Sequence, residues 1–355
     1  MLPFLTADLP GTGGVLRSRD EDFVVDEELP YPASGSGEHV FVRIEKRGLT
    51  TRFAAAQIAA ALGIAERDIG IAGMKDRHAV TRQWLSLPPP VTPEAASALA
   101  LDGITVLEAV RHGHKLRTGH VRRNRFVLRV RGAAPGSAER ARAILDALAR
   151  APGAPNWYGE QRFGRDGDNA AKGRALLATG KRSRDKKLDR LFVSALQSEL
   201  FNAWLAARLA DGLYRAVLAG DVCHKKGGGM FTSDDPATDE ARLVAGELVV
   251  TGPMFGDKMR RPAEGSAAAE REAAVLAAAG LTADSFAPVR ALAEGTRRDA
   301  AIEVADGCVT AGDPAADGET YEVAFALPGG AYATAVMREV MKTVPQRVDE
   351  APGVA

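Results

Sequence analysis

The stretch AGMKDRHAVTRQW, residues Ala72–Trp84, runs from the end of one predicted β-strand, Ile69–Ala72, into a second, Ala79–Leu87. The loop between these strands carries Asp76, with cationic side chains before and after it. An aspartate at such a turn often bonds nearby backbone amides, which is a structural role. The flanking cations also favour its ionised form, which suits a nucleophile or a base. These residues alone leave both roles open.

Strands and helices alternate on both sides of this loop. Val40, Val42 and Ile44 occupy alternate positions of His39–Glu45, which is typical of a strand with one buried face. Further strands are predicted at 104–110 and 126–131, and helices at 53–62 and 139–149. A turn-rich break follows at Ala151–Pro155. After it we expect a long helix at 188–209, surface loops at 227–229 and 233–240, a helix at 262–279, strands at 302–304 and 321–327, and a last helix at 335–342.

Length and composition bound the fold class. A chain of 355 residues is long enough for about two domains. Its 46% apolar and 26% charged residues exclude disordered and fibrous classes. Strand-rich ends surround a helix-richer middle, which predicts an α+β (mixed α/β) protein with one domain inserted into another.

Cysteine content and hydropathy indicate the compartment. Cys223 and Cys308 are the two cysteines and form no CxxC pair, which excludes a disulfide framework and a cysteine zinc cage. The most apolar stretches, 53–65 and 273–281, are shorter than the ~18–20 residues of a membrane span. The N-terminus has no basic segment before an apolar one, so no secretory signal is evident. We expect a cytoplasmic protein with no membrane association.

The distribution of charge points to a polyanionic partner. The chain has 46 Lys and Arg and 46 Asp and Glu, so it is not a uniformly basic polycation. However, Arg111–Arg131 contains eight Lys and Arg, three His and no acid. Lys181–Arg190 adds six cations against two acids. Such density suggests contact with phosphates, and a solvated arginine-rich edge strand is the alternative. We therefore expect a positive surface around Asp76.

Two weaker motifs point elsewhere. His112, His114 and His120 suggest a metal site, but no cysteine or carboxylate lies near them in the sequence to complete a ligand set. Gly11–Gly14 resembles a phosphate loop but lacks the GK[ST] of a Walker motif and a following helix. A nucleotide hydrolase is therefore the weakest reading.

Six blocks in the chain resemble the TruD family of tRNA pseudouridine synthases, in family order. The most specific are the AGxKD and YGxQRFG patterns, and the match is less clear over 165–300 beyond Ser194–Asn202. The blocks are GTGGVLRSRDEDFVVDEE (Gly11–Glu28), GEHVFVRIEKRGLTT (Gly37–Thr51), AGMKDRHAVTRQW (Ala72–Trp84), RRNRF (Arg122–Phe126), PNWYGEQRFG (Pro155–Gly164) and LPGGAYATAVMRE (Leu327–Glu339).

This resemblance implies a fold and a reaction. The fold would be a pseudouridine-synthase catalytic core, a mixed sheet with flanking helices, at 1–153 and 299–355, with a TRUD-specific α/β domain inserted at 154–298. The reaction would convert a uridine in the D-stem of tRNA, at position 13, to pseudouridine. The family uses no cofactor and no metal. We expect tRNA as the partner and a monomeric enzyme.

The resemblance also implies site residues. Asp76 corresponds to the catalytic aspartate, and two mechanisms fit it: attack on C1′ of the ribose or abstraction of the C2′ proton. Phe126 falls where the family places an aromatic against the target base, with a core aromatic as the alternative, and Asn124 is a polar contact beside it. Arg17 is expected to pair with Asp76. Candidates for holding RNA or shaping the pocket are Lys75, Arg77, His78, Gln83 and Arg162.

A protein of another class remains as an alternative. A non-catalytic tRNA-binding protein or RNA chaperone would keep the fold and the basic surface. It would bind tRNA with salt-dependent affinity and yet release no tritium from uridine labelled at C5. The intact AGMKD loop argues against it, because a pure binder has no need of a carboxylate among phosphate ligands.

Overall fold

The computed structural model describes residues 2–312 and 318–343 and divides into two compact units. The sheet unit comprises, of the described residues, 9–147, 304–312, 318–333 and 337–343. The helical unit comprises 2–8, 148–303 and 334–336. No helix among the described residues combines the length and the hydropathy needed to cross a bilayer.

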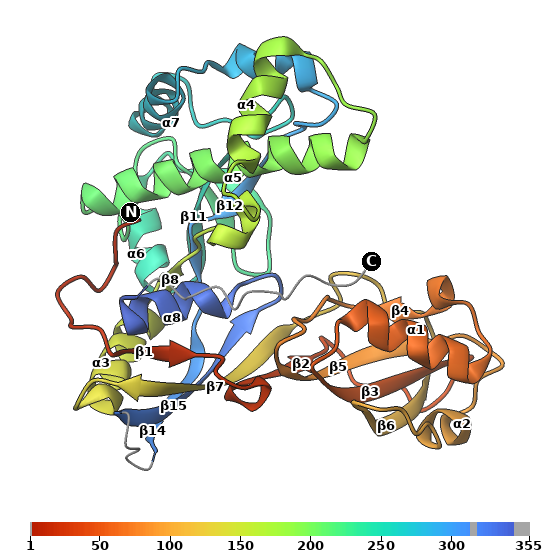
Figure 1. Ribbon diagram of the computed structural model, residues 1–355. Coiled ribbons are helices and arrows are strands. Elements are labelled where there is room, and N and C mark those ends of the chain that lie inside the picture. Colours follow the sequence, from red (N-terminus) through yellow and green to blue (C-terminus); the bar gives the residue numbers. More distant parts are fainter. Residues whose placement is uncertain (1, 313–317, 344–355) are drawn as a thin grey trace. The chain divides into compact units, whose positions relative to one another are not determined.

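The sheet unit is built on a mixed sheet (Figure 1). Only β2 (Phe23–Glu28) and β5 (Val80–Leu87) run parallel; the other neighbouring strands of the main sheet are antiparallel. Two short strands, β1 (Gly13–Leu16) and β4 (Gly70–Ile71), pair with β7 (Arg123–Ala133) and β5. The strand order is β14 (Ala305–Ala311), β15 (Glu319–Pro328), β7 (Arg123–Ala133), β2 (Phe23–Glu28), β5 (Val80–Leu87), β3 (His39–Arg47) and β6 (Ile104–His112).

Helices flank this sheet. Helix α1 (Thr51–Leu62) begins at the cap Thr50, whose hydroxyl accepts from Phe53 N at 3.2 Å, and ends at Gly63 with φ 65°. Its alanine-rich face packs on buried apolar residues of β3 and β5, and Figure 1 shows the helix along these strands. The remaining helices that contain residues of this unit are α2 (Pro93–Ser97), α3 (Ser137–Ala149) and α8 (Ala333–Met341).

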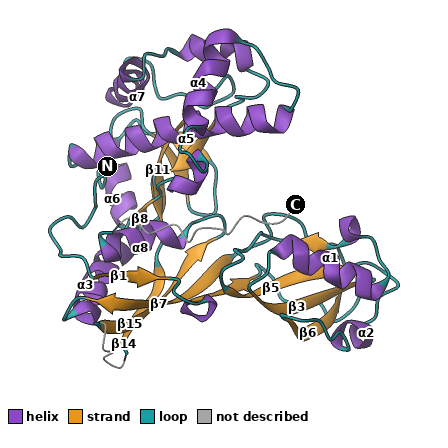
Figure 2. Ribbon diagram, in the orientation of Figure 1, coloured by secondary structure: helices purple, strands orange, loops and turns teal. Residues whose placement is uncertain are grey.

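The helical unit combines a smaller sheet with several helices, one of which is much longer than the others (Figure 2). The 25-residue helix α5 (Lys186–Ala210) lies at its centre and supplies a large share of its apolar core. A buried ion pair, Arg208–Asp221, holds the end of α5 to the loop before the sheet. The other elements are β9 (Val222–Lys225), β10 (Met230–Thr232), β11 (Leu248–Met254), β12 (Thr296–Asp299), the pair β8 (Ala154–Pro155) and β13 (Ala301–Ile302), α4 (Asn169–Thr179), α6 (Pro236–Val244) and α7 (Ala267–Ala278).

Several element predictions are wrong. The acidic segment 233–240 is not a loop: Asp235 caps α6, whose Pro236 takes the first turn, where proline is favoured. The helix predicted from 262 begins only at Ala267, because Ser266 is its cap. Of the strand predicted at 302–304, only Ile302 lies in a strand, at the end of β13, and residues 303 and 304 lie between β13 and β14. Gly11–Gly14, which was expected to have no following helix, leads into strand β1 from Gly13.

Part of the basic stretch is neutralised within the sheet unit. Three arginines of β7 form ion pairs with carboxylates on neighbouring strands and turns, because the sheet brings together segments that are distant in the sequence. Fewer cations of this stretch are therefore available to a polyanion than its composition suggests. The pairs are Arg123 with Glu28 and Asp306, Arg129 with Glu322, and Arg131 with Asp22.

Candidate active site around Asp76

Asp76 lies in the loop before β5, with its side chain half exposed at 51%. Its Oδ2 accepts a hydrogen bond of 2.6 Å from the guanidinium of Arg17, which is 19% exposed. The predicted ion pair between these two residues is therefore confirmed. The carboxylate is accessible, and its bond to Arg17 uses only Oδ2, so Oδ1 is left to react with a bound substrate.

Arg17 is held in an unusual backbone conformation. Its φ is 64°, in the left-handed region that non-glycine residues rarely adopt. The guanidinium carbon lies 3.8 Å from the centre of the Phe23 ring, so the ring supports the cation from below. The Nε atom is buried and has no hydrogen-bond partner. A strained backbone conformation persists only where surrounding contacts hold it in place. In this conformation the guanidinium of Arg17 reaches Asp76.

Lys46 holds the main chain of the Asp76 loop by hydrogen bonds. It is completely buried on β3, and its Nζ donates to the main-chain oxygens of Asp76 at 2.8 Å and Leu49 at 2.6 Å. Lys46 was not among the site residues predicted from the sequence. Strand alternation could have indicated it, because Lys46 continues the inward-facing positions of Val40, Val42 and Ile44.

Burial makes Lys46 sensitive to pH. Removal from water lowers its pKa to about 8, and the charge of Asp76 opposes this in part. In the unfolded chain lysine stays protonated to about pH 10. Between these values the unfolded chain holds one more proton than the folded chain, so the folded state gains stability as the pH rises.

We therefore expect wild type to gain stability relative to Lys46→Met between about pH 8 and pH 10, by as much as about 3 kcal/mol. Urea unfolding at several pH values measures this difference. Lys258→Met, at an exposed lysine of the helical unit, serves as the control and is expected to show no such trend. Parallel pH curves for wild type and Lys46→Met would contradict the buried, protonated lysine.

A buried polar network supports the other side of the loop. The hydroxyl of Thr51 accepts from Lys75 N at 2.9 Å and donates to Gln83 Oε1 at 2.9 Å. The Lys75 ammonium pairs with Glu27, whose carboxylate is fully buried and also accepts from Trp84 N at 3.1 Å. Burial raises the pKa of Glu27 in spite of Lys75. Lys75 and Gln83 thus shape the loop from the interior.

Phe126 and Asn124 lie on the same face of the sheet as Lys46. Lys46 on β3 is opposite Thr81 on β5, Thr81 is opposite Val25 on β2, and Val25 is opposite Phe126 on β7. Residues paired in this way across strands point to one face. Asn124, two residues before Phe126, therefore belongs to the same face.

The face carries buried polar atoms without partners. Among the described residues these include Thr81 Oγ1, Gln83 Nε2 and Asn124 Oδ1. Buried polar atoms are almost always hydrogen-bonded, so each such atom calls for an explanation. The ring of Phe126 is only 6% exposed and packs against Phe23 and Phe325, with centroids 6.2 and 5.6 Å apart.

The remaining predicted residues lie in two places. Arg77 donates to Gly48 O at 3.2 Å, and His78 Nδ1 is 3.8 Å from a carboxylate oxygen of Asp20, both near the Asp76 loop. Arg162 lies in the helical unit, on the 3₁₀ helix Glu160–Phe163, where its Nε donates to Ser198 Oγ at 3.0 Å. Its NH2 group also bonds the hydroxyl of Ser194 on α5.

The three histidines of the basic stretch come together around an aromatic ring. The Tyr31 hydroxyl is 2.6 Å from His120 Nδ1, and His112 Nε2 is 3.2 Å from His114 Nε2. Burial lowers the pKa of His112. Across residues 2–312 and 318–343, no three His, Cys, Asp or Glu side chains are placed to hold a metal ion. The cluster packs as an aromatic group with Tyr31 at its centre.

Comparison with known proteins identifies the family. The family model for tRNA pseudouridine synthase D (TruD) matches residues 2–181 and 171–340, which together span most of the chain. The chain belongs to the TruD family. Curated relatives named tRNA pseudouridine synthase D include one from Anaeromyxobacter dehalogenans, 53% identical over 348 residues, with 96% of each chain covered. Another, from Thermus thermophilus, is 42% identical over 341 residues, covering 96% of this chain and 92% of its own.

A solved structure supports the fold. The crystal structure of a TruD protein from Methanosarcina mazei matches with a TM-score of 0.79 at 22% identity, covering 97% of this chain and 96% of that one. The predicted mixed α/β fold is thus confirmed. The two strongest sequence patterns, AGMKD and YGEQRFG, lie within the part of the chain that the family model matches.

Proposed function

We propose that this TruD family member converts a uridine in the D-stem of tRNA, at position 13, to pseudouridine, with Asp76 as the nucleophile or base. The observation that carries the proposal is the accessible Asp76 carboxylate, ion-paired with a strained Arg17 and anchored through its main chain by buried Lys46. The relatives named tRNA pseudouridine synthase D support the choice of substrate and reaction.

The chemistry breaks the N1–C1′ bond of uridine and forms a C5–C1′ bond. N1 gains a proton and C5 loses one, so the reaction is an isomerisation without net oxidation. Asp76 can act by attack on C1′, which gives a ribosyl ester while the base turns. It can also act by taking the C2′ proton, which gives a glycal. Arg17 steadies the carboxylate in either route, because its NH2 group bonds Oδ2 and leaves Oδ1 for the sugar.

The base has to leave the helical stem before it can react. Extrusion of a stacked nucleotide costs a few kcal/mol, and protein groups that receive the base offset this cost. Asn124 Oδ1 is a buried acceptor without a partner, which suits the N3–H donor of uracil. We assign the Phe126 ring to the wall against which the base lies, and Arg77 and His78 to contacts with the RNA backbone beside the loop.

The wider organisation follows from the same proposal. We propose that 154–298 form a TRUD-specific domain inserted into a catalytic domain made of 1–153 and 299–355. Within the inserted domain Arg162 contacts RNA phosphates or holds the YGEQRFG turn. We propose that the enzyme acts in the cytoplasm as a monomer and needs neither metal nor cofactor, since Asp76 supplies the chemistry.

Mapping of pseudouridines by carbodiimide modification tests the proposal. tRNA from cells with and without the gene is compared, and loss of one pseudouridine in the D-stem is the expected result. An unchanged pattern would overturn the proposed substrate. If the purified protein also binds tRNA but releases no tritium from uridine labelled at C5, the protein is a tRNA binder instead of an enzyme.

A further inference from the structure

The turn between α4 and α5, together with the start of α5, carries a dense set of cations without counter-ions. All six are exposed, and none forms an ion pair with a carboxylate in the part of the chain that the structure describes. Three of the four arginines of β7 differ, because carboxylates on neighbouring strands and turns pair with them. We call this set the α4–α5 cation patch: Lys181, Arg182, Arg184, Lys186, Lys187 and Arg190.

The two acids within this segment are engaged with the backbone. Asp185 caps α5, and its Oδ1 accepts from Lys187 N at 2.8 Å and Leu188 N at 3.2 Å. Asp189 is buried, and its Oδ2 accepts from Ser183 N at 2.9 Å. These bonds fix the shape of the turn and hold both carboxylates back toward the main chain. The cationic side chains therefore face solvent on an ordered turn.

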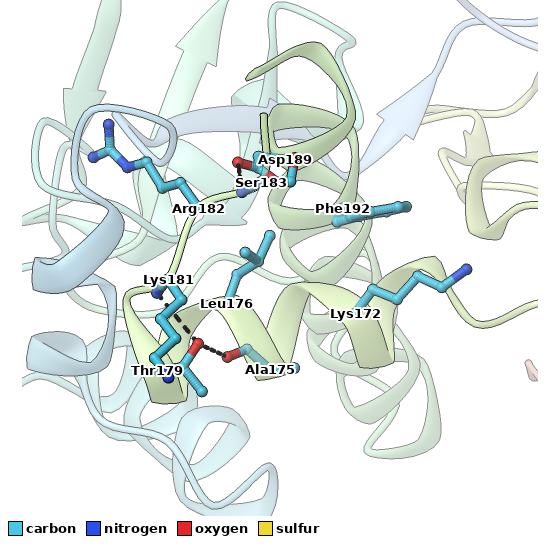
Figure 3. Close-up of a pocket in the computed structure, with 9 residues that line it drawn as sticks. All are labelled: Lys172, Ala175, Leu176, Thr179, Lys181, Arg182, Ser183, Asp189 and Phe192. Carbon is cyan, nitrogen blue, oxygen red and sulfur yellow. Dashed lines mark hydrogen bonds between the residues drawn. The ribbon is translucent and has the colours of Figure 1, made fainter. Parts of the chain in front are cut away.

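A pocket of about 340 Å³ adjoins the patch (Figure 3). Leu176 and Phe192 contribute an apolar surface, and Lys181 and Arg182 stand at its border. Lys172 lies over the Phe192 ring, with its Nζ 5.3 Å from the ring centre. Nearby, Leu188 is 44% exposed on the first turn of α5. Cations beside an apolar and aromatic surface match a ligand that joins phosphates to flat rings.

The charge and the shape both favour RNA as the ligand. Six like charges between Lys181 and Arg190 repel one another, and phosphodiesters relieve this repulsion. The positive end of the α5 dipole adds to the attraction for anions at the same place. Long, flexible side chains spaced along the turn and the start of α5 also suit a backbone that curves past them. An acidic protein offers the charge but not the row of exposed bases and riboses that the apolar pocket fits.

We propose that the α4–α5 cation patch binds phosphates of the substrate tRNA and supplies affinity without taking part in the chemistry. This inference rests on the proposed function, since it takes tRNA to be the substrate. The patch lies in the helical unit, whereas Asp76 lies in the sheet unit. Its contribution is therefore expected in tRNA affinity and in KM, while kcat stays within about twofold.

Neutralising three cations of the patch tests the inference. The variant Arg182→Gln, Arg184→Gln, Lys187→Gln is made in the Asp76→Asn background, so that binding is measured without turnover. Unmodified tRNA transcript is titrated at salt concentrations from about 50 to 200 mM. Each lost phosphate contact lowers the slope of log K against log salt by about 0.7–0.9, so a fall of roughly 2–3 is expected, with at least tenfold weaker binding at low salt.

A matched control removes the same number of charges from the same unit. Arg150→Gln, Lys226→Gln, Lys258→Gln changes three exposed cations outside the patch, and we expect it to alter the slope by less than one. Equal losses in the two variants would overturn the inference, because the effect would then follow net charge alone. An unchanged slope in the patch variant would also overturn it and would assign the patch to a different partner.

The outcomes separate this inference from the proposed function. If wild type forms pseudouridine in tRNA and the patch variant binds tRNA normally, the function stands and the patch inference fails. If wild type forms no pseudouridine but patch neutralisation still weakens tRNA binding, the catalytic proposal fails and the patch remains an RNA-binding surface. Unfolding curves of both triple variants check that the substituted proteins are folded.

Discussion

Asp76→Asn is expected to lower pseudouridine formation in tRNA by at least about 10³-fold. Asparagine has the size of aspartate and can still accept a hydrogen bond from Arg17, so the loop keeps its form. Its amide can neither attack C1′ nor accept the C2′ proton. Single-turnover release of tritium from uridine labelled at C5 measures the loss, and tRNA binding is expected to change by less than about threefold.

Asp306→Asn is the matched control for this substitution. Asp306 is similarly exposed, at 46%, and pairs with Arg123 at 2.8 Å within the same unit. Loss of one exposed ion pair costs at most about 1 kcal/mol, so the control should retain nearly full activity. Full activity of Asp76→Asn would remove Asp76 from the chemistry. Equal loss in both variants would indicate a general effect of charge.

Replacing Phe126 is expected to affect both stability and turnover. Truncation to alanine leaves a cavity between Phe23 and Phe325, and large-to-small changes of buried aromatics cost about 3–5 kcal/mol of the free energy of unfolding. Phe126→Leu keeps most of the apolar volume and isolates the role of the ring. If the ring receives the extruded base, the single-turnover rate of Phe126→Leu falls about tenfold or more, because base stacking on an aromatic contributes about 1–3 kcal/mol.

Phe325→Leu provides the comparison. Phe325 is opposite Phe126 in the neighbouring strand and is fully buried, so the same substitution makes a similar change in packing. We expect a comparable loss of stability but little change in the single-turnover rate. Identical rates for the two leucine variants and wild type would assign Phe126 to the core alone, which is the alternative that the sequence left open.

Local signals predicted the elements that depend on neighbouring residues. Thr50 and Gly63 bound α1, and alternation along 39–45 marks β3, although that strand continues to Arg47. The prediction for 233–240 failed because polar composition outweighed the capping signal of Asp235 followed by Pro236. Lys46 was missed for a related reason, since a charged residue within a strand pattern was not read as an inward position.

The sequence by itself determined the family, the mixed α/β class and the aspartate at which chemistry is expected, because these rest on short motifs and local patterns that can be read along the chain. Only the tertiary structure decided which charges are available. It pairs Arg131 with Asp22 from 109 positions away, and it buries Lys46 beneath the carbonyl of Asp76. Coulombic and hydrogen-bonding partners depend on distance in space. Strand order and register set these distances, and the order of residues along the chain does not display them.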